Sequence, residues 1–462
     1  MMQIAPVIHG NRQWFWWNLK STSFIPIALN NYLEILFRYR TSQIEMPLIN
    51  NIPEFREKIS GYLSTYSGGK TTETLAEVRT INEIPCNLYV NEFWTSRQRQ
   101  ASSIHEVSYR ACFKPQLPRF FIELLTDAND AVYDPFTGRG TTIIEAALLG
   151  RSVISNDVNP LSRILCEPRL TPPGIPDVEK RLEEIEYDSS GKADIDLSMF
   201  FHESTLSEIV SLRDYLDERR RKGSEDSIDK WIRMVATNRL TGHSGGFFSV
   251  YTLPPNQAVS PESQVKINKK RDQVPEYRDT KKLILKKTKS LLKNLEKEEA
   301  ENLYSVSKIA VFLSNDAVSV PEIGDDSVAL TVTSPPFLNI VQYSKDNWLR
   351  CWFNSLDAGA IEKKITMAGT TKEWSRVMGD VFSELFRITK PGGWVAFEVG
   401  EVRNGKVCLD EYVVPLGINA GFECAGVVIN EQHFTKTSNI WGIDNRKKGT
   451  NTNRIVVFRK PS

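Results

Sequence analysis

Two short motifs, far apart in the chain, place reactive or ligand-binding residue types where predicted strands end. The first is Asp134-Pro135-Phe136-Thr137-Gly138-Arg139-Gly140, between a predicted strand and a predicted helix. Its two glycines allow a tight turn and a close approach of the backbone to a ligand. Asp157 closes the next predicted strand, where a carboxylate could accept hydrogen bonds from ribose hydroxyls. The motif predicts a nucleoside-cofactor site. The third glycine of the dinucleotide fingerprint is absent, so an ordinary turn is the alternative.

The second motif is Thr333-Ser334-Pro335-Pro336-Phe337, which follows a β-branched stretch at 328–332. Two prolines cannot continue a sheet ladder, so they hold a stiff loop at the end of a strand. Ser334 Oγ and the Pro335 carbonyl could accept both hydrogens of an exocyclic amine, which would localise a lone pair on its nitrogen. Phe337 could stack on the ring that carries the amine. A rigid turn without chemistry is the alternative.

The elements that must position both motifs follow the rhythm of a parallel α/β sheet. Before residue 166 we expect a helix at 117–125, a strand at 131–133, a helix at 141–149 and a strand at 152–155. After residue 308 we expect strands at 310–313, 328–332 and 394–399, a helix at 381–389, and a strand at 454–458 that suits a sheet edge or hairpin. Ligands bind at the carboxyl ends of such strands, which is where both motifs fall.

Residues 166–305 interrupt this rhythm. Helices are predicted at 179–187 and 206–221, followed by a Gly-, Pro- and aromatic-rich stretch at 243–257 with a strand-like part at 247–251. Residues 266–293 hold eleven Lys/Arg against three acids and have one apolar side, which predicts an amphipathic basic helix. The insertion is therefore a candidate for contacts with nucleic acid, and a solvated charged helix face is the alternative.

Composition is that of an ordinary globular protein. The 462 residues include 58 Lys+Arg and 57 Asp+Glu, and 40% are hydrophobic, which excludes collagen, coiled coil and wholesale disorder. No stretch reaches the roughly eighteen apolar residues of a membrane span. Six scattered cysteines without a CxxC pair predict reduced thiols in a cytoplasmic protein, with no zinc site.

Taken together, the two motifs resemble those of the S-adenosylmethionine-dependent amino-methyltransferases that act on DNA. The first is similar to the family's FxGxG cofactor motif, and the second to its catalytic (S/D/N)PP(F/Y) motif. His105–Gln116 resembles the flanking motif that helps to hold methionine, and Lys390–Gly393 resembles a late helix-to-strand turn. The resemblance implies a Rossmann-like sheet domain and S-adenosylmethionine as cofactor, and covers about 105–165 and 308–460.

Site residues carry over position by position. The resemblance implies cofactor contacts at the following residues: Lys114, Asp134, Phe136, Gly138, Gly140, Asp157 and Asp316. It implies that Ser334, Pro335, Pro336 and Phe337 grip the target base. In this family a recognition region usually falls at a few defined joints, whereas here the insertion separates Asp157 from Asp316. The Asp316 assignment is the one that this departure puts in question.

The implied partner is double-stranded DNA, with a cognate restriction endonuclease as an open possibility. In the insertion, phosphate or base-edge contacts are expected at Arg239, His243, Asn256, Gln257, Lys269, Lys270 and Arg271. Internal bases are inaccessible in a duplex, so the target base is expected to flip out.

Three alternatives stay open. The leading Ser and trailing Phe favour cytosine N4 over adenine N6 as the acceptor. A catalytically silent regulator that binds S-adenosylmethionine and DNA is the alternative from another class. Methylation of guanine N2 in RNA is a weaker one, because neither an Asp-Pro-Pro-Tyr loop nor an N-terminal RNA-binding domain is evident.

The predicted organisation has three parts: an N-terminal extension at 1–90, a methyltransferase domain at 91–165 and 306–462, and a mainly helical, basic insertion at 166–305. Met46 offers a second start, which leaves the need for residues 1–45 open.

Overall fold

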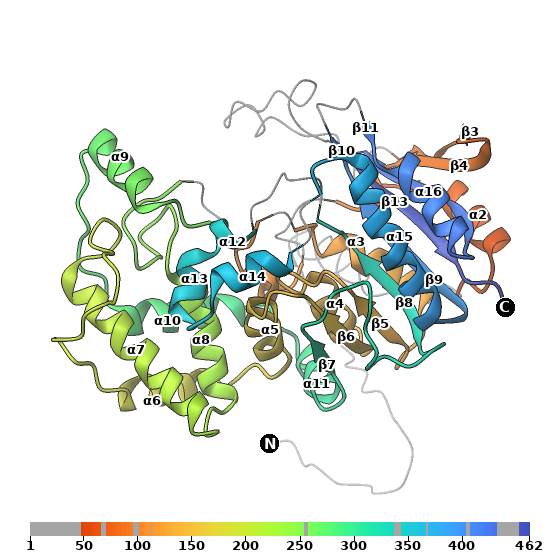
Figure 1. Ribbon diagram of the computed structural model, residues 1–462. Helices are drawn as coiled ribbons and strands as arrows, with labels where there is room; N and C mark the ends of the chain where they lie inside the picture. Colours follow the sequence, from red (N-terminus) through yellow and green to blue (C-terminus); the bar gives the residue numbers. More distant parts are fainter. Residues whose placement is uncertain are drawn as a thin grey trace, which may run out of the picture. The chain divides into compact units, whose positions relative to one another are not determined.

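The computed structural model describes residues 48–65, 71–95, 101–110, 112–253, 257–336, 343–365, 368–402, 407–431 and 452–462. This part belongs to a single unit that begins at Leu48. In Figure 1 a sheet with flanking helices occupies one side of this unit and a cluster of helices the other.

A nine-stranded mixed sheet carries both motifs, in the order β3-β4-β12-β13-β9-β8-β5-β6-β7. The strands are β3 (Leu75–Ile81), β4 (Ile84–Asn91), β5 (Ala131–Asp134), β6 (Ser152–Asn156), β7 (Val311–Leu313), β8 (Val328–Thr333), β9 (Thr389–Val399), β12 (Glu423–Glu431) and β13 (Thr452–Arg459). From β7 to β9 the strands are parallel, as expected. The chain runs outward from β5 through β6 to β7 and then returns to β8 on the other side of β5. That reversal is a topological switch point, where open α/β sheets bind their ligands.

The structure refines three expectations about strands. Lys390–Gly393 loops out within β9, because Val328 pairs with Thr389 and Leu330 already pairs with Trp394. β13 forms a hairpin with β12, as one alternative had it, but it lies inside the sheet between β12 and β9. β3 and β4 belong to the same sheet, so residues 75–91 are not part of a separate extension. Short strand pairs β1 (Leu63–Ser64) with β2 (Thr72–Glu73), and β10 (Glu401–Val402) with β11 (Val407–Cys408), lie outside this sheet.

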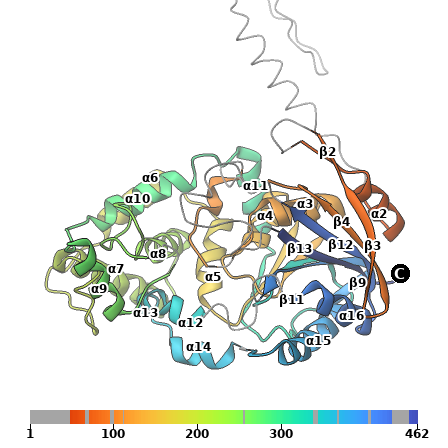
Figure 2. The same ribbon diagram turned by 90° about the horizontal axis from the view of Figure 1, so that it is seen from above.

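Helices cover both faces of the sheet (Figure 2). On one face lie α3 (Gln116–Leu125), α4 (Thr141–Leu148) and α11 (Lys297–Ser307); on the other lie α15 (Thr371–Ile388) and α16 (Asp410–Asn419). Apolar residues of α15 and α16 pack on inward side chains of β8, β9, β12 and β13 to form one core. α15 is longer than the helix predicted at 381–389. α2 (Ile52–Ser60) packs against β12 and reaches the sheet with Phe55, whose ring lies 5.6 Å from that of Trp394.

The helical insertion has its own core. It contains α6 (Ile175–Glu184), α7 (Glu203–Arg221), α8 (Ser227–Arg239), α9 (Pro261–Arg271) and α10 (Thr280–Leu291). α13 (Trp348–Phe353), from the chain after the second motif, adds Leu349 and Phe353 to this core, together with Leu161 and Leu165 of α5 (Leu161–Cys166). The remaining short helices are η2 (Ser103–His105), η3 (Glu167–Leu170), α12 (Tyr343–Asp346) and α14 (Ala358–Lys364).

Two predictions for the insertion were wrong. The basic segment is not one helix but two, because Asp272 has a left-handed backbone (φ 49°) and Pro275 follows it before α10 begins. The strand-like stretch at 247–251 contributes only an isolated bridge between Gly242 and Tyr251. In addition, α11 packs on α4 of the sheet domain, so the helices of the insertion end with α10.

Candidate active site at the switch point of the sheet

The two motifs meet at the carboxyl ends of β5 and β8. The Thr333 hydroxyl donates a hydrogen bond to Asp134 Oδ1 (2.6 Å), and the Phe136 amide donates to the same oxygen (3.1 Å). Burial raises the pKa of Asp134 to about 7, although these two bonds oppose that rise. A buried carboxylate thus fastens the glycine-rich turn to the loop that follows β8, and Asp134 also lines the pocket.

The glycine-rich turn needs its glycines. Gly138 and Gly140 have left-handed backbones (φ 53° and 82°). A Cβ on Gly140 would lie 2.4 Å from Cys166 Sγ, so no larger residue fits there. The turn leads directly into α4. Gly138 lines the pocket, whereas Gly140 contacts α5, so its role is to pack the turn on its neighbour.

Asp157 lies directly across from this turn. Its Oδ2 accepts the Gly138 amide (2.8 Å) and its Oδ1 accepts the Asn159 amide (2.9 Å). Burial raises its pKa to about 6, and both amide bonds oppose this rise. Each oxygen keeps one lone pair, so the carboxylate can still accept bonds from hydroxyl groups in the pocket.

Asp316 reaches the same pocket despite the long insertion. Asn156 at the end of β6 donates to the Asn315 carbonyl (3.1 Å), and the Asn315 amide donates back to Asn156 Oδ1 (2.9 Å). This reciprocal pair fixes the ends of β6 and β7 side by side. The pairing of these strands therefore brings Asp157 and Asp316 together, whatever length of chain separates them.

Arg139, inside the glycine-rich turn, had no role in the sequence analysis. It is buried, and its guanidinium donates to the carbonyls of His105, Val107 and Phe113. It therefore holds the flanking segment against the turn. From this segment Tyr109, Cys112 and Phe113 line the pocket, whereas Lys114 is not among the lining residues.

The loop after β8 presents Ser334 and Pro336 to the pocket, and Pro335 is buried behind them. Trp374 of α15 donates its indole N–H to the Pro336 carbonyl (3.0 Å), which anchors the loop. Phe337 lies outside the described residues.

Glu398 of β9 is a residue that sequence reasoning missed. Burial raises the pKa of this carboxyl, while hydrogen bonds with the hydroxyl of Ser334 and the amide of Asn453 lower it in part. The Asn453 bond measures 3.0 Å. A lone acid within the apolar stretch at 394–399 was the only signal in the sequence.

The pocket suits a nucleoside cofactor with a charged tail. It encloses about 1090 Å³ of empty space, part of it open to solvent. Its polar lining residues include Asp134, Asp157, Asn159, Asp316, Ser334 and Lys364, and its apolar walls include Phe136, Val158, Ala317, Trp374 and Met378. Carboxylates with spare lone pairs suit ribose hydroxyls and an amine, and apolar walls suit a purine ring. The residues present therefore fit S-adenosylmethionine.

The residues expected to contact DNA have different surroundings. Arg239 is only 8% exposed, lies 4.0 Å from the centroid of the Phe247 ring, and donates to Asn238 Oδ1 and the Gly246 carbonyl. Burial lowers its pKa to about 10. Arg239 is therefore part of the packing, and its expected base contact needs correction. His243 is exposed beside Phe247, and Gln257 accepts a bond from Arg110 (2.9 Å). Asn256 lies outside the described residues.

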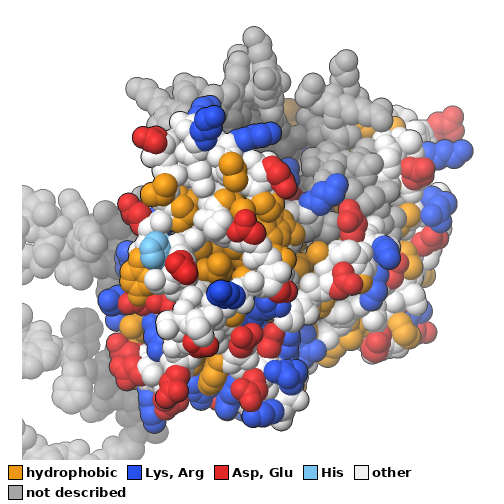
Figure 3. Space-filling model, turned by 60° about the vertical axis from the view of Figure 1, so that its left-hand side comes forward, with side chains coloured by type: hydrophobic (Ala, Val, Ile, Leu, Met, Phe, Trp, Pro, Cys, Tyr) orange, Lys and Arg blue, Asp and Glu red, His pale blue; other side chains and the backbone are white. Residues whose placement is uncertain are grey.

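Lys269, Lys270 and Arg271 are exposed at the end of α9. Arg271 lies 3.8 Å from the centroid of the Tyr251 ring, and among the described residues neither Lys269 nor Lys270 makes an ion pair. Figure 3 shows the side of the molecule that carries the insertion: charged side chains of both signs alternate over its lower part, and apolar side chains gather nearer its middle.

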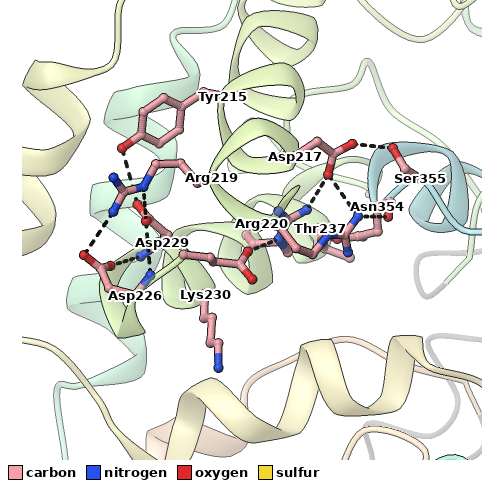
Figure 4. A network of polar contacts seen from close by, with 12 residues as sticks. Tyr215, Asp217, Arg219, Arg220, Asp226, Asp229, Lys230, Thr237, Asn354 and Ser355 are labelled. Carbon is pink, nitrogen blue, oxygen red and sulfur yellow. Dashed lines mark hydrogen bonds and ion pairs between the residues drawn. The ribbon is translucent and has the colours of Figure 1, made fainter. Parts of the chain in front are cut away.

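In another part of the insertion, side chains of opposite charge form a network of polar contacts (Figure 4). Asp229, buried in α8, pairs with Arg181 and with Arg219 (2.7 Å). Asp226 caps α8 and pairs with the same two arginines. Arg181 and Arg219 therefore stabilise the insertion through ion pairs.

Comparisons with known proteins support the family resemblance. Residues 29–161 match the family described as DNA methylase, of the N6/N4 type. The match begins within the segment at 1–90 that was expected to be an extension. Type II methyltransferase M.MvaI of Kocuria varians is 29% identical over 128 residues, 27% of this chain and 25% of the relative. Type II methyltransferase M.BsoBI of Geobacillus stearothermophilus is 23% identical over 290 residues, 57% of this chain and 54% of the relative. Matches thus span about half or less of each relative's length.

An S-adenosylmethionine-dependent methyltransferase structure from Methanosarcina mazei aligns with 73% of this chain and 95% of its own, at 11% identity and a TM-score of 0.27. The fold is identified from the order of the strands in the sheet, not from this alignment. Among the described residues no cluster of His, Cys, Asp or Glu could hold a metal ion, and none of the helices there is long and apolar enough to cross a membrane.

Proposed function

We propose that the protein transfers a methyl group from S-adenosylmethionine to the N4 amine of cytosine in DNA, and the match of residues 29–161 to the DNA methylase family supports this proposal. One observation carries the proposal. A single pocket brings together the glycine-rich turn, Asp157, Asp316 and Ser334, although the insertion separates them in the chain. A nucleoside site and an amine-accepting loop in one cavity are the two halves of an amino-methyl transfer.

Asp157 would hold the ribose hydroxyls and Asp316 an amine of the cofactor base, while the flanking segment at 105–113 would close the far end of the pocket. The bound cofactor supplies a methyl group already activated on a sulfonium. The protein's task is therefore to align the acceptor and exclude competing geometries.

Ser334 acts as an acceptor and not as a nucleophile. Its Oγ and the Pro335 carbonyl accept the two hydrogens of the target amine, which withdraws the nitrogen lone pair from the ring and directs it at the methyl group. After the transfer the amine nitrogen would carry a positive charge, and the proton that it then loses would leave to solvent past Ser334 Oγ and the Pro335 carbonyl, which hold its hydrogens.

Glu398 is a positioning residue in this scheme. When ionised it accepts the Ser334 hydroxyl hydrogen, so the lone pairs of Oγ remain available to the substrate amine. When protonated it would donate to Oγ and occupy one of those lone pairs. The Asn453 amide, bonded to the same carboxyl, favours the ionised form.

The insertion would present DNA to this pocket. Lys269 and Lys270 would neutralise phosphates, with His243 and Gln257 as candidate contacts to base edges. Flipping the base into the pocket would bring its amine to Ser334.

The test is to incubate the protein with labelled S-adenosylmethionine and plasmid DNA, digest the DNA to nucleosides and identify the products by mass spectrometry. N4-methylcytosine is the expected product. N6-methyladenine would keep the mechanism and change the base. Bound cofactor without labelled DNA would instead favour an RNA substrate or a silent regulator.

Adenine N6 is the second candidate acceptor, because the matched family covers both N6 and N4 enzymes. A cognate restriction endonuclease is proposed only through the likeness to Type II methyltransferases.

A further inference from the structure

β3 is an outermost strand of the nine-stranded sheet, and no other described strand pairs with its free edge. Six consecutive residues, 75–80, are exposed, among them Leu75 (62%) and Val78 (69%). An open edge with apolar side chains is a template for another strand.

The hairpin register shows which backbone groups face that edge. Thr80 lies opposite Pro85, which has no N–H, so these two residues form a non-hydrogen-bonded pair. The hairpin turn, Asn82-Glu83, has positive φ at both residues (46° and 68°), as expected of a two-residue turn flanked by a bonded pair. Since bonded and non-bonded pairs alternate, the N–H and C=O groups of residues 76, 78 and 80 point away from β4 toward the free edge.

The sequence of β3 is complementary to itself about Val78. In an antiparallel pair of two β3 strands with Val78 opposite Val78, Glu77 lies opposite Arg79 twice, and Ala76 lies opposite Thr80 twice. Residues 76, 78 and 80, whose backbone groups face the edge, then form the bonded pairs. Glu77 and Arg79 fall at non-bonded pairs, where side chains come closest. Within one chain these two side chains already lie on the same face, 2.9 Å apart.

We propose that β3 is a self-association edge that pairs with β3 of a second copy of this chain about a two-fold axis at Val78. Such an interface is isologous and closes on itself as a dimer. Charges on an edge strand often serve to prevent pairing. Here, however, the two charges have opposite signs and are symmetric about the axis, so pairing brings attraction. The proposal is independent of the reaction catalysed.

Sedimentation of the full chain over a range of concentrations tests this inference. We expect a dimer for the wild type. Glu77→Arg and Arg79→Glu should each weaken dimerisation at least about tenfold, since each puts like charges opposite one another twice. Mixing the two single variants should restore association, because every cross-strand pair in the mixed dimer is then of opposite sign. The double variant E77R/R79E should also dimerise.

Glu301→Arg, a charge reversal on exposed α11, is the matched control and should leave the dimer intact. A wild type that stays monomeric would overturn the proposal, and so would a dimer that both single variants leave unchanged. Dimers formed only after removal of residues 1–47 would assign this edge to the chain's own N-terminal segment instead. Circular dichroism of each variant checks that the fold is kept.

Discussion

Charged groups serve opposite purposes in the two halves of this molecule. In the pocket, Asp134 and Asp157 are held by hydroxyl and amide donors, and burial raises the pKa values of both. In the insertion, Asp226 and Asp229 are held by arginines. Burial would raise the pKa of Asp226, but the bond from Arg181, the bond from the Asp229 amide and the charges of Arg181 and Arg219 together hold it below its usual value. A carboxylate held by neutral donors can accept further hydrogen bonds from a ligand, whereas the oxygens of a carboxylate held in ion pairs are already occupied.

The kind of partner that a charged side chain has therefore distinguishes functional from structural charges better than the number of charges in a region does. The insertion is rich in arginine, yet Arg181, Arg219 and Arg233 are all paired with acids. The candidates for phosphate contact are exposed lysines that form no ion pair among the described residues, such as Lys269 and Lys270 at the end of α9. The comparison therefore predicts that pocket variants change function and that variants in the arginine network change stability.

The largest effect is expected for Ser334→Ala. It removes an acceptor of the amine hydrogens, so kcat should fall by on the order of 100-fold or more. Cofactor affinity, measured by calorimetry, should hardly change, because Asp157 and the glycine-rich turn are untouched. If cofactor binding fell in parallel with turnover, the role given to Ser334 would be wrong.

Asp157→Asn should weaken cofactor binding by about 20-fold, the scale of hydrogen bonds to a charged group. In the wild type, affinity should be constant well above pH 6 and should fall below it, because the pKa of Asp157 is about 6 and only the ionised form has all its lone pairs free. The variant should lack this acid limb. Equal affinities of both proteins at pH 8 would exclude the ribose role.

Glu398→Gln should lower kcat about tenfold at saturating cofactor and DNA, with little change in either affinity. Wild-type kcat should fall on the acid side as Glu398 takes up a proton. Because burial raises the pKa of this group, that fall should begin at a higher pH than for an exposed glutamate. A variant that keeps the wild-type pH profile would show that another group titrates.

The smallest effect is expected for the double variant Lys269→Ala/Lys270→Ala. DNA affinity should fall about fivefold, and the slope of log K against log salt should become shallower by about 2. The matched control is Arg219→Ala, which should lower the melting temperature and leave the salt slope unchanged, since Arg219 is paired with Asp229. The reverse pattern would contradict the distinction between paired and unpaired cations.

Much of the sheet could be predicted because local patterns govern it. The predicted bounds of β5, β6 and β8 and of the turn at Gly138 and Gly140 lie within one or two residues of those observed. Runs of β-branched residues and glycines restrict the local backbone conformation, so the sequence shows them directly. The hairpin of β3 and β4 was missed. β3 is exposed at residues 75–80 and carries two charges, and β4 is largely buried, but Pro85 and Asn87 interrupt its apolar run. The break in the basic segment was missed because a single left-handed residue, Asp272, ends α9.

The sequence by itself determined the chemistry: a glycine-rich turn with an acid after the next strand, and a Ser-Pro-Pro loop that can accept an amine. Each of these signals lies within a short stretch of sequence, so it can be recognised without the tertiary structure. Only the tertiary structure decided which groups share one space. Strand pairing joined Asp316 to Asp157 across the insertion and placed Glu398 against Ser334, and packing within the insertion buried Arg239 against Phe247. Burial and partnership depend on residues far away in the chain, and no local pattern contains them.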